Sequence, residues 1–152
     1  MDVLGPILAI GGIFLAIVII MALASYVLMA AGLHIMGNNH DVEYAWVAWI
    51  PIGQFYVIGA ILDEIELFGY EIKNLKWILL GAGVIPSFLP LSDMGFIGGL
   101  LGLAIAAFTV ICLYKLLEMK GSSSPIGVLI ASFFVYIVLP IVIFNLRNRP
   151  VN

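Results

Sequence analysis

The feature that most constrains this chain is an uncharged stretch at its start. Between Val3 and Met36 no side chain carries a charge unless His34 is protonated. About 20 apolar residues are enough to cross the hydrocarbon core of a bilayer, and this stretch has about 34. The chain is 64% hydrophobic and only 10% charged, whereas soluble domains are about one quarter charged. We therefore expect an integral membrane protein whose excess apolar side chains face lipid.

Charged and turn-forming residues divide a single membrane domain, 1–152, into five hydrophobic segments. The segments lie at about 3–36, 44–62, 77–91, 94–114 and 126–145. The first is too long to stand upright in a bilayer, so it must tilt, protrude or bend, with Gly11 and Gly12 as its weak point. The stretch Gly37-Asn38-Asn39 is expected to end it, because Gly and Asn tolerate the left-handed conformation of a helix C-cap. Ser92 with Asp93, and Ser124 with Pro125, have the pattern of helix N-termini.

The predicted fold is all-α, a polytopic bundle of four or five transmembrane segments with one or two broken or re-entrant helices. Pro51 restricts Ile50 to extended backbone, which suits a kinked span or a helix that begins at Pro51 after an interfacial stretch. The full span is favoured because exposed non-helical backbone is costly in lipid. Pro86 and Pro90 interrupt the third segment, and Pro140 is expected to kink the last one. The aromatic residues expected to lie at the head-group level are Tyr44, Trp46, Trp49 and Trp77.

The basic residues do not assign a side of the membrane. They are Lys73, Lys76, Lys115, Lys120, Arg147 and Arg149. The last four flank the final hydrophobic segment, two before it and two after it, so they cancel if that segment crosses. The sequence therefore places the N-terminus outside if the second segment is re-entrant and inside if it spans.

Small residues recur at four-residue spacing in the fourth segment. The residues of this stripe are Gly95, Gly98, Gly99, Gly102 and Ala106. Small side chains let the backbones of two membrane helices approach closely. The favoured interpretation is contact with another helix of the same chain, and the alternative is a second copy or a partner subunit.

Four carboxylates form the most strongly charged stretch. They are Asp63, Glu64, Glu66 and Glu71. A solvated cap over the membrane is favoured, and contact with a cation or a basic partner is the alternative. Asp63 and Glu66 would share a helix face if the second helix continued to Leu67.

Isolated polar residues within the apolar segments mark a second kind of candidate. Gln54 and Ser87 are expected either to bond to a neighbouring helix or to line a polar path. His34 and His40 do not match the ligand spacing of a metal site. The single cysteine, Cys112, lies in an apolar run and is expected to be a buried packing residue.

No motif indicates catalysis. The sequence has no phosphate loop, no nucleophile elbow, no HExxH and no CxxC, so we expect no catalytic residue, no metal and no cofactor. With a net charge of -3 and no basic stripe, nucleic acid is not expected as a partner. Membrane lipids are expected, with a membrane-protein partner or a second copy of the chain.

The Ala-Trp-Val-Ala-Trp-Ile-Pro-Ile stretch at 45–52, followed by Phe55 and Tyr56, resembles a group of small bacterial multi-pass membrane proteins of no assigned activity. Val84-Ile85-Pro86, Leu113-Tyr114-Lys115 and the region of Pro140 resemble later parts of the same group. The resemblance covers about 42–144 and implies a bacterial cytoplasmic membrane.

Two functions follow from these features. The favoured one is a non-catalytic integral membrane protein that serves as a packing or accessory subunit of a membrane assembly. The alternative is a small channel, transporter or lipid-handling protein that uses the broken helices near Pro51 and Pro86.

Overall fold

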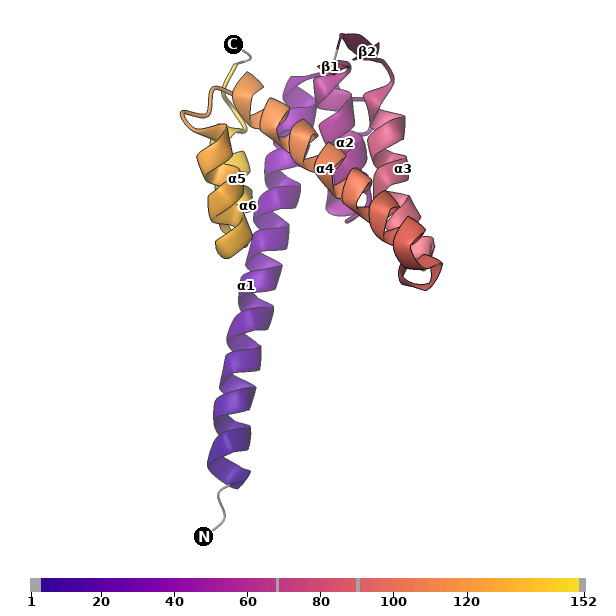
Figure 1. Cartoon of the computed structure of the whole chain (residues 1–152). Coiled ribbons are helices and arrows are strands. Elements are labelled where there is room, and N and C mark those ends of the chain that lie inside the picture. Colours follow the sequence, from indigo (N-terminus) through magenta and orange to yellow (C-terminus); the bar gives the residue numbers. More distant parts are fainter. Residues whose placement is uncertain (1–3, 68, 90, 151–152) are drawn as a thin grey trace.

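The computed structural model describes residues 4–67, 69–89 and 91–150, most of which are helical (Figure 1). In chain order the elements are α1 (Leu4–Asn39), the 3₁₀ helix η1 (Ala45–Trp49), α2 (Gly53–Leu62), β1 (Ile65–Leu67), β2 (Tyr70–Ile72), α3 (Leu75–Phe88), the 3₁₀ helix η2 (Leu91–Met94), α4 (Gly95–Met119), α5 (Pro125–Phe134) and α6 (Val138–Leu146). The expected all-α class is confirmed, with one small hairpin of strands added.

Helix α1 is continuous and extends far beyond the rest of the molecule (Figure 1). At 36 residues it is about 54 Å long at 1.5 Å per residue. It does not break at Gly11 or Gly12, and it runs through Gly37 to Asn39. The helix ends within the predicted Gly37-Asn38-Asn39 stretch, at Asn39, and the left-handed residue that follows is Asp41, with φ 54°. Side chains at 8–24 are all exposed, and packing begins at Ser25.

The second hydrophobic segment is two short elements in place of the favoured single kinked span. Ile50 is extended before Pro51, as predicted, with φ -100° and ψ 128°. The chain then reverses so tightly that a Cβ on Gly53 would overlap Val47 O. Helix α2 has 10 residues and is about 15 Å long, half the thickness of a hydrocarbon core.

The charged stretch after α2 forms an antiparallel hairpin that was not predicted from the sequence. Ile65 pairs with Ile72 and Glu66 with Glu71. Helix α2 ends at Leu62, and Asp63 has φ 57°. Asp63 and Glu66 therefore do not share a helix face, because no helix reaches them.

Helices α3 and α4 form the next pair. Helix α3 contains Pro86 near its end and lies so close to α2 that a Cβ on Gly59 would stand 2.7 Å from Leu75 O. Helix α4 begins at Gly95, and its N-cap residue, Met94, makes no capping hydrogen bond through its side chain. The predicted cap at Ser92 and Asp93 is wrong, because both residues belong to η2.

The last hydrophobic segment folds back on itself as α5 and α6 (Figure 1). Its predicted start is confirmed, since Ser124 Oγ accepts a hydrogen bond from the Gly127 N–H at 3.3 Å. Instead of a kink at Pro140, the helix stops at Phe134 and restarts at Val138. Pro140 explains the position of the break, because its ring excludes the helical carbonyl four residues earlier, at Tyr136.

The core lies where α1, α2, α4 and α6 end and where α3 begins. Its fully buried members include Leu33, Met36, Val57, Leu75, Leu79, Cys112, Leu116, Leu117 and Ile143. Among the described residues, α1 and α4 are the helices long and apolar enough to cross a membrane, and only 11% of the most apolar window of each is buried. Most of their apolar surface thus faces outward, which indicates association with a membrane.

Candidate functional site

The charged residues of the described chain gather at one end of the molecule, here called the polar end. It comprises the C-terminal ends of α1, α2, α4 and α6 together with the β1–β2 hairpin (Figure 1). All six lysines and arginines lie there. Asp93 lies on η2, which joins the other ends of α3 and α4.

Three contacts bring distant parts of the chain together at the polar end. The Asn39 side-chain amide donates to Arg147 O at 3.0 Å, which joins α1 to the end of α6. The Arg149 guanidinium donates to Gly121 O at 3.0 Å, and the Lys120 ammonium donates to Arg149 O at 3.2 Å. The two basic pairs that flank the last segment therefore lie at the same end of the molecule. The physical reason is the reversal between α5 and α6.

Lys120 is the most unusual residue of the polar end. Its side chain is 2% exposed, although lysine is almost never fully buried without a partner of opposite charge. Its Nζ lies 2.7 Å from His40 Nε2. Because an ammonium group has only donors, His40 must accept through Nε2 and carry its own proton on Nδ1.

The surroundings favour this arrangement of protons. Burial lowers the pKa of His40 from its ordinary value, the charge of Lys120 lowers it further, and Asp41 partly opposes them. Burial also lowers the pKa of Lys120. A neutral His40 is therefore the form present at physiological pH, and it is the form that can accept from Lys120.

Lys120 has no carboxylate partner among the described residues. Within the described residues, ion pairs join Lys73 to Glu71 at 3.4 Å and Lys115 to Glu118 at 3.1 Å. The acceptors of Lys120 are an imidazole and a backbone carbonyl, both of them neutral. Among the residues that the structure describes, the buried positive charge of Lys120 is therefore not compensated by a negative one.

Lys120 is one of the residues that line a cavity of about 630 Å³, here called the Lys120 pocket. It is lined by Asn39, His40, Lys120, Asn148, Arg149 and Pro150. Two of these residues are basic and two carry side-chain amides, and no Asp or Glu is among the described residues that line it. Its chemistry suits an anion.

The acidic residues singled out in the sequence separate into different places. Asp63 lines a cavity of about 470 Å³ together with His40, Asp41 and Lys76. Glu64 and Glu66 line another, of about 480 Å³, which also contains Lys115 and Glu118. Glu71 forms an exposed ion pair with Lys73 on and beside the hairpin. The carboxylates therefore line different cavities, although Glu66 and Glu71 are paired across the hairpin.

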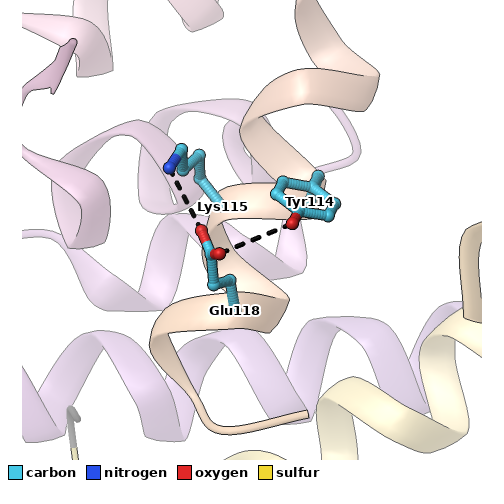
Figure 2. A network of polar contacts seen from close by, with 3 residues as sticks. All are labelled: Tyr114, Lys115 and Glu118. Carbon is cyan, nitrogen blue, oxygen red and sulfur yellow. Dashed lines mark hydrogen bonds and ion pairs between the residues drawn. The ribbon is translucent and has the colours of Figure 1, made fainter. Parts of the chain in front are cut away.

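Figure 2 shows the polar contacts at the end of α4. The carboxylate of Glu118 accepts from the Lys115 ammonium at 3.1 Å and from the Tyr114 hydroxyl at 3.4 Å. The three residues lie on adjacent turns of one helix, where side chains three and four apart meet. This contact holds Lys115 beside a carboxylate, in contrast with Lys120.

The stripe of small residues on α4 divides in two. Gly98 is buried against Leu91 O of η2, so its role lies within the chain. Gly95 and Gly99 have open space where a Cβ would stand, and Ala106 is exposed. Gly102 is half-buried beside the Leu91 side chain. Internal packing thus accounts for one edge of the stripe and leaves the other edge open.

The remaining candidates lie apart from the Lys120 pocket. Gln54 is half-buried in the first turn of α2, and the Ser87 hydroxyl donates to Gly83 O in its own helix at 3.0 Å. Neither lines one of the five cavities described for this chain. The aromatic residues Tyr44, Trp46, Trp49 and Trp77 are all exposed, and Trp49 O accepts a hydrogen bond from the Tyr26 hydroxyl in the middle of α1. Over the described ranges no three His, Cys, Asp or Glu side chains are grouped to hold a metal.

Sequence reasoning missed the Lys120 pocket because its members are far apart in the chain. His40 and Lys120 are 80 residues apart, and neither belongs to a recognisable motif. The signal available was the clustering of basic residues at the ends of the last two hydrophobic segments. No protein-family model, curated protein or solved structure matches the chain.

Proposed function

We propose that the protein is a non-catalytic, multi-pass integral membrane protein that serves as an accessory subunit of a bacterial membrane assembly. The observation that carries the proposal is the free half of α1. Residues 8–24 are apolar and exposed, and they extend beyond every other described element (Figure 1). A second protein surface alongside this helix is the proposed partner, either another membrane subunit or a second copy.

The length of α1 is the physical argument for a partner. A helix of about 54 Å exceeds a hydrocarbon core of about 30 Å by roughly 24 Å, and tilts above about 40° are unusual. The polar end fixes its C-terminal end at one interface, because Asn39 and the basic residues prefer the head groups. The excess at the other end would place side chains such as Leu8 and Phe14 in water unless protein covers them.

The proposed membrane arrangement has three crossings and two re-entrant hairpins, fewer crossings than the four or five expected from the sequence. Helices α1, α3 and α4 cross, with the shorter α3 completed by η2. The segments η1–α2 and α5–α6 enter and leave from the polar end. Since all six basic residues lie at that end, the polar end is cytoplasmic and the N-terminus lies outside.

The open edge of the small-residue stripe is the second surface proposed for docking. Gly99 has nothing within 4 Å of an added Cβ, so Gly99→Ile is accommodated inside the chain while it blocks close approach by another helix. We expect Gly99→Ile to abolish recovery of the assembly from membranes in mild detergent. The matched control is Gly81→Ile on α3, which also meets open space.

Cross-linking supplies an independent test of the free half of α1. In a Cys112→Ser background, a single cysteine introduced at Ile17 should cross-link in native membranes to one defined species. A monomer that forms no cross-link at Ile17, and whose size is unchanged by Gly99→Ile, would contradict the accessory-subunit proposal.

The alternative function, a small channel, transporter or lipid-handling protein, is supported by the tight reversal of the chain between η1 and α2 at Pro51, which suits a re-entrant hairpin. Re-entrant backbone is found where membrane proteins place substrates. Gln54 and Ser87 remain the proposed polar lining. Flux of ions, dyes or labelled lipid through proteoliposomes, lowered by Gln54→Ala, would favour this function, and absence of flux in the unaltered protein would exclude it.

A further inference from the structure

We propose that the Lys120 pocket is a binding site for a phosphate group, supplied either by the head group of an anionic phospholipid or by a free phosphate. This inference uses the membrane location proposed above but not the accessory role. A loss of docking at Gly99 and a loss of anion binding at Lys120 would therefore be observed separately.

The first argument is the uncompensated charge. Burying an ammonium group is unfavourable unless an opposite charge or a full set of hydrogen bonds replaces its water. Lys120 is 2% exposed and has two neutral acceptors, His40 Nε2 and Arg149 O. An ammonium has three N–H groups, so one is left for a ligand. An anion in the adjacent cavity would provide both the missing charge and the third acceptor.

The second argument is the set of donors around the cavity. Arg149 uses one N–H for Gly121 O and retains four. Asn39 uses one amide hydrogen for Arg147 O and retains the other, and Asn148 also lines the cavity. A planar guanidinium, an ammonium and two amides match the several oxygens of a phosphate.

The third argument is the contrast with the neighbouring cavities. The pocket that contains Asp63 and the pocket that contains Glu64 both have carboxylates among their lining residues. The described residues that line the Lys120 pocket include two basic residues and no Asp or Glu. The selectivity for an anion is therefore local to this cavity and does not come from the net charge of the chain, which is -3.

The geometry also provides a place for the remainder of a lipid. A second cavity of about 300 Å³ shares Arg149 with the Lys120 pocket. Its other lining residues are Ser122, Ser123, Val128, Val142, Asn145 and Leu146. They combine two hydroxyls and an amide with apolar side chains of α5 and α6. Basic pockets between membrane helices on the cytoplasmic side are recognised sites for anionic head groups.

The test measures thermal unfolding of the full chain in nanodiscs. One arm compares phosphatidylcholine alone with phosphatidylcholine containing phosphatidylglycerol, and the other adds inorganic phosphate to the phosphatidylcholine nanodiscs. The variants are Lys120→Gln and Arg149→Gln. Lys73→Gln is the control, because it removes the same charge from an exposed ion pair outside the pocket.

We expect phosphatidylglycerol to raise the Tm of the unaltered protein and of Lys73→Gln. In Arg149→Gln and Lys120→Gln we expect about tenfold more phosphatidylglycerol to be needed for the same shift, because each variant loses a charge-assisted contact. An equal shift with inorganic phosphate would identify free phosphate as the source. A shift with phosphatidylglycerol alone would identify the lipid.

Two results would overturn the proposal. One is the absence of a Tm shift in both arms. The other is a loss in Lys73→Gln as large as the loss in Arg149→Gln, which would mean that surface charge in general, and not the pocket, responds to the anion. Arg149 is exposed and its variant is expected to fold, so the test stands even if Lys120→Gln does not.

Discussion

At the residue scale, the contact between His40 and Lys120 makes the stability of the polar end dependent on pH. The pKa of His40 in the folded chain lies below its ordinary value of 6.5, first because the side chain is buried and then because Lys120 is close. A group with a lowered folded-state pKa stabilises the fold fully above its unfolded value, and this contribution is lost as pH falls below it. Protonated His40 could also no longer accept from Lys120.

We therefore expect the Tm of the protein to fall by a few degrees as pH is lowered from about 7 to about 5. The comparison variant is His40→Gln, which keeps a side-chain acceptor but does not titrate. Its Tm should fall less over the same range in the same nanodiscs. Parallel pH profiles for the two proteins would contradict a role for His40.

At the element scale, the packing of α2 against α3 depends on the absence of a side chain at Gly59. An added Cβ would stand 2.5 Å from Lys76 Cα and 2.7 Å from Leu75 O, and backbone atoms cannot move aside as a flexible side chain can. Gly81 is the natural contrast, since it lies inside α3 with nothing within 4 Å of an added Cβ.

We expect Gly59→Ala to lower the free energy of unfolding by about 1–3 kcal/mol, the range measured for overpacked cores. Gly81→Ala should be neutral or stabilise by up to about 1 kcal/mol, because alanine favours the helix. Denaturant unfolding in detergent measures both variants. Equal effects would show that the close approach of α2 and α3 does not limit stability.

At the scale of the whole molecule, the positions of the chain ends and loops decide the topology. If η1–α2 and α5–α6 are both re-entrant from the polar end, positions 39, 66, 123 and 148 all lie on one side of the membrane. In a Cys112→Ser background, single cysteines replacing Asn39, Glu66, Ser123 and Asn148 should all react with a membrane-impermeant thiol reagent only when the cytoplasmic face is open.

A cysteine replacing Asp93, on η2, should react from the opposite side and serves as the internal control. Labelling of Asn39→Cys and Glu66→Cys from opposite sides would show that the segment between them crosses. Labelling of Ser123→Cys and Asn148→Cys from opposite sides would show that α5 and α6 together make a span.

Much of the local structure was predictable because it depends on near neighbours in the chain. The uncharged stretch predicted α1, the extended backbone at Ile50 followed from Pro51, and the start of α5 followed from Ser124 and Pro125. Each of these depends on hydrophobic length, on the fixed ring of proline or on a side chain that caps the next turn. The membrane class of the chain rests on the same local information.

What the tertiary structure decided is which ends of the helices meet. The reversal between α5 and α6 is held by packing of α6 on α1, where Gly32 lies against Ile143 and Phe144. That contact joins residues more than 100 positions apart, and no local pattern encodes it. It brings Arg149 to Gly121 and to Lys120, which gathers the basic residues at one end and creates the Lys120 pocket. The sequence by itself determined that the chain is apolar and helical. The Lys120 pocket and the gathering of the basic residues at one end of the molecule depend on packing between segments that are far apart in the chain.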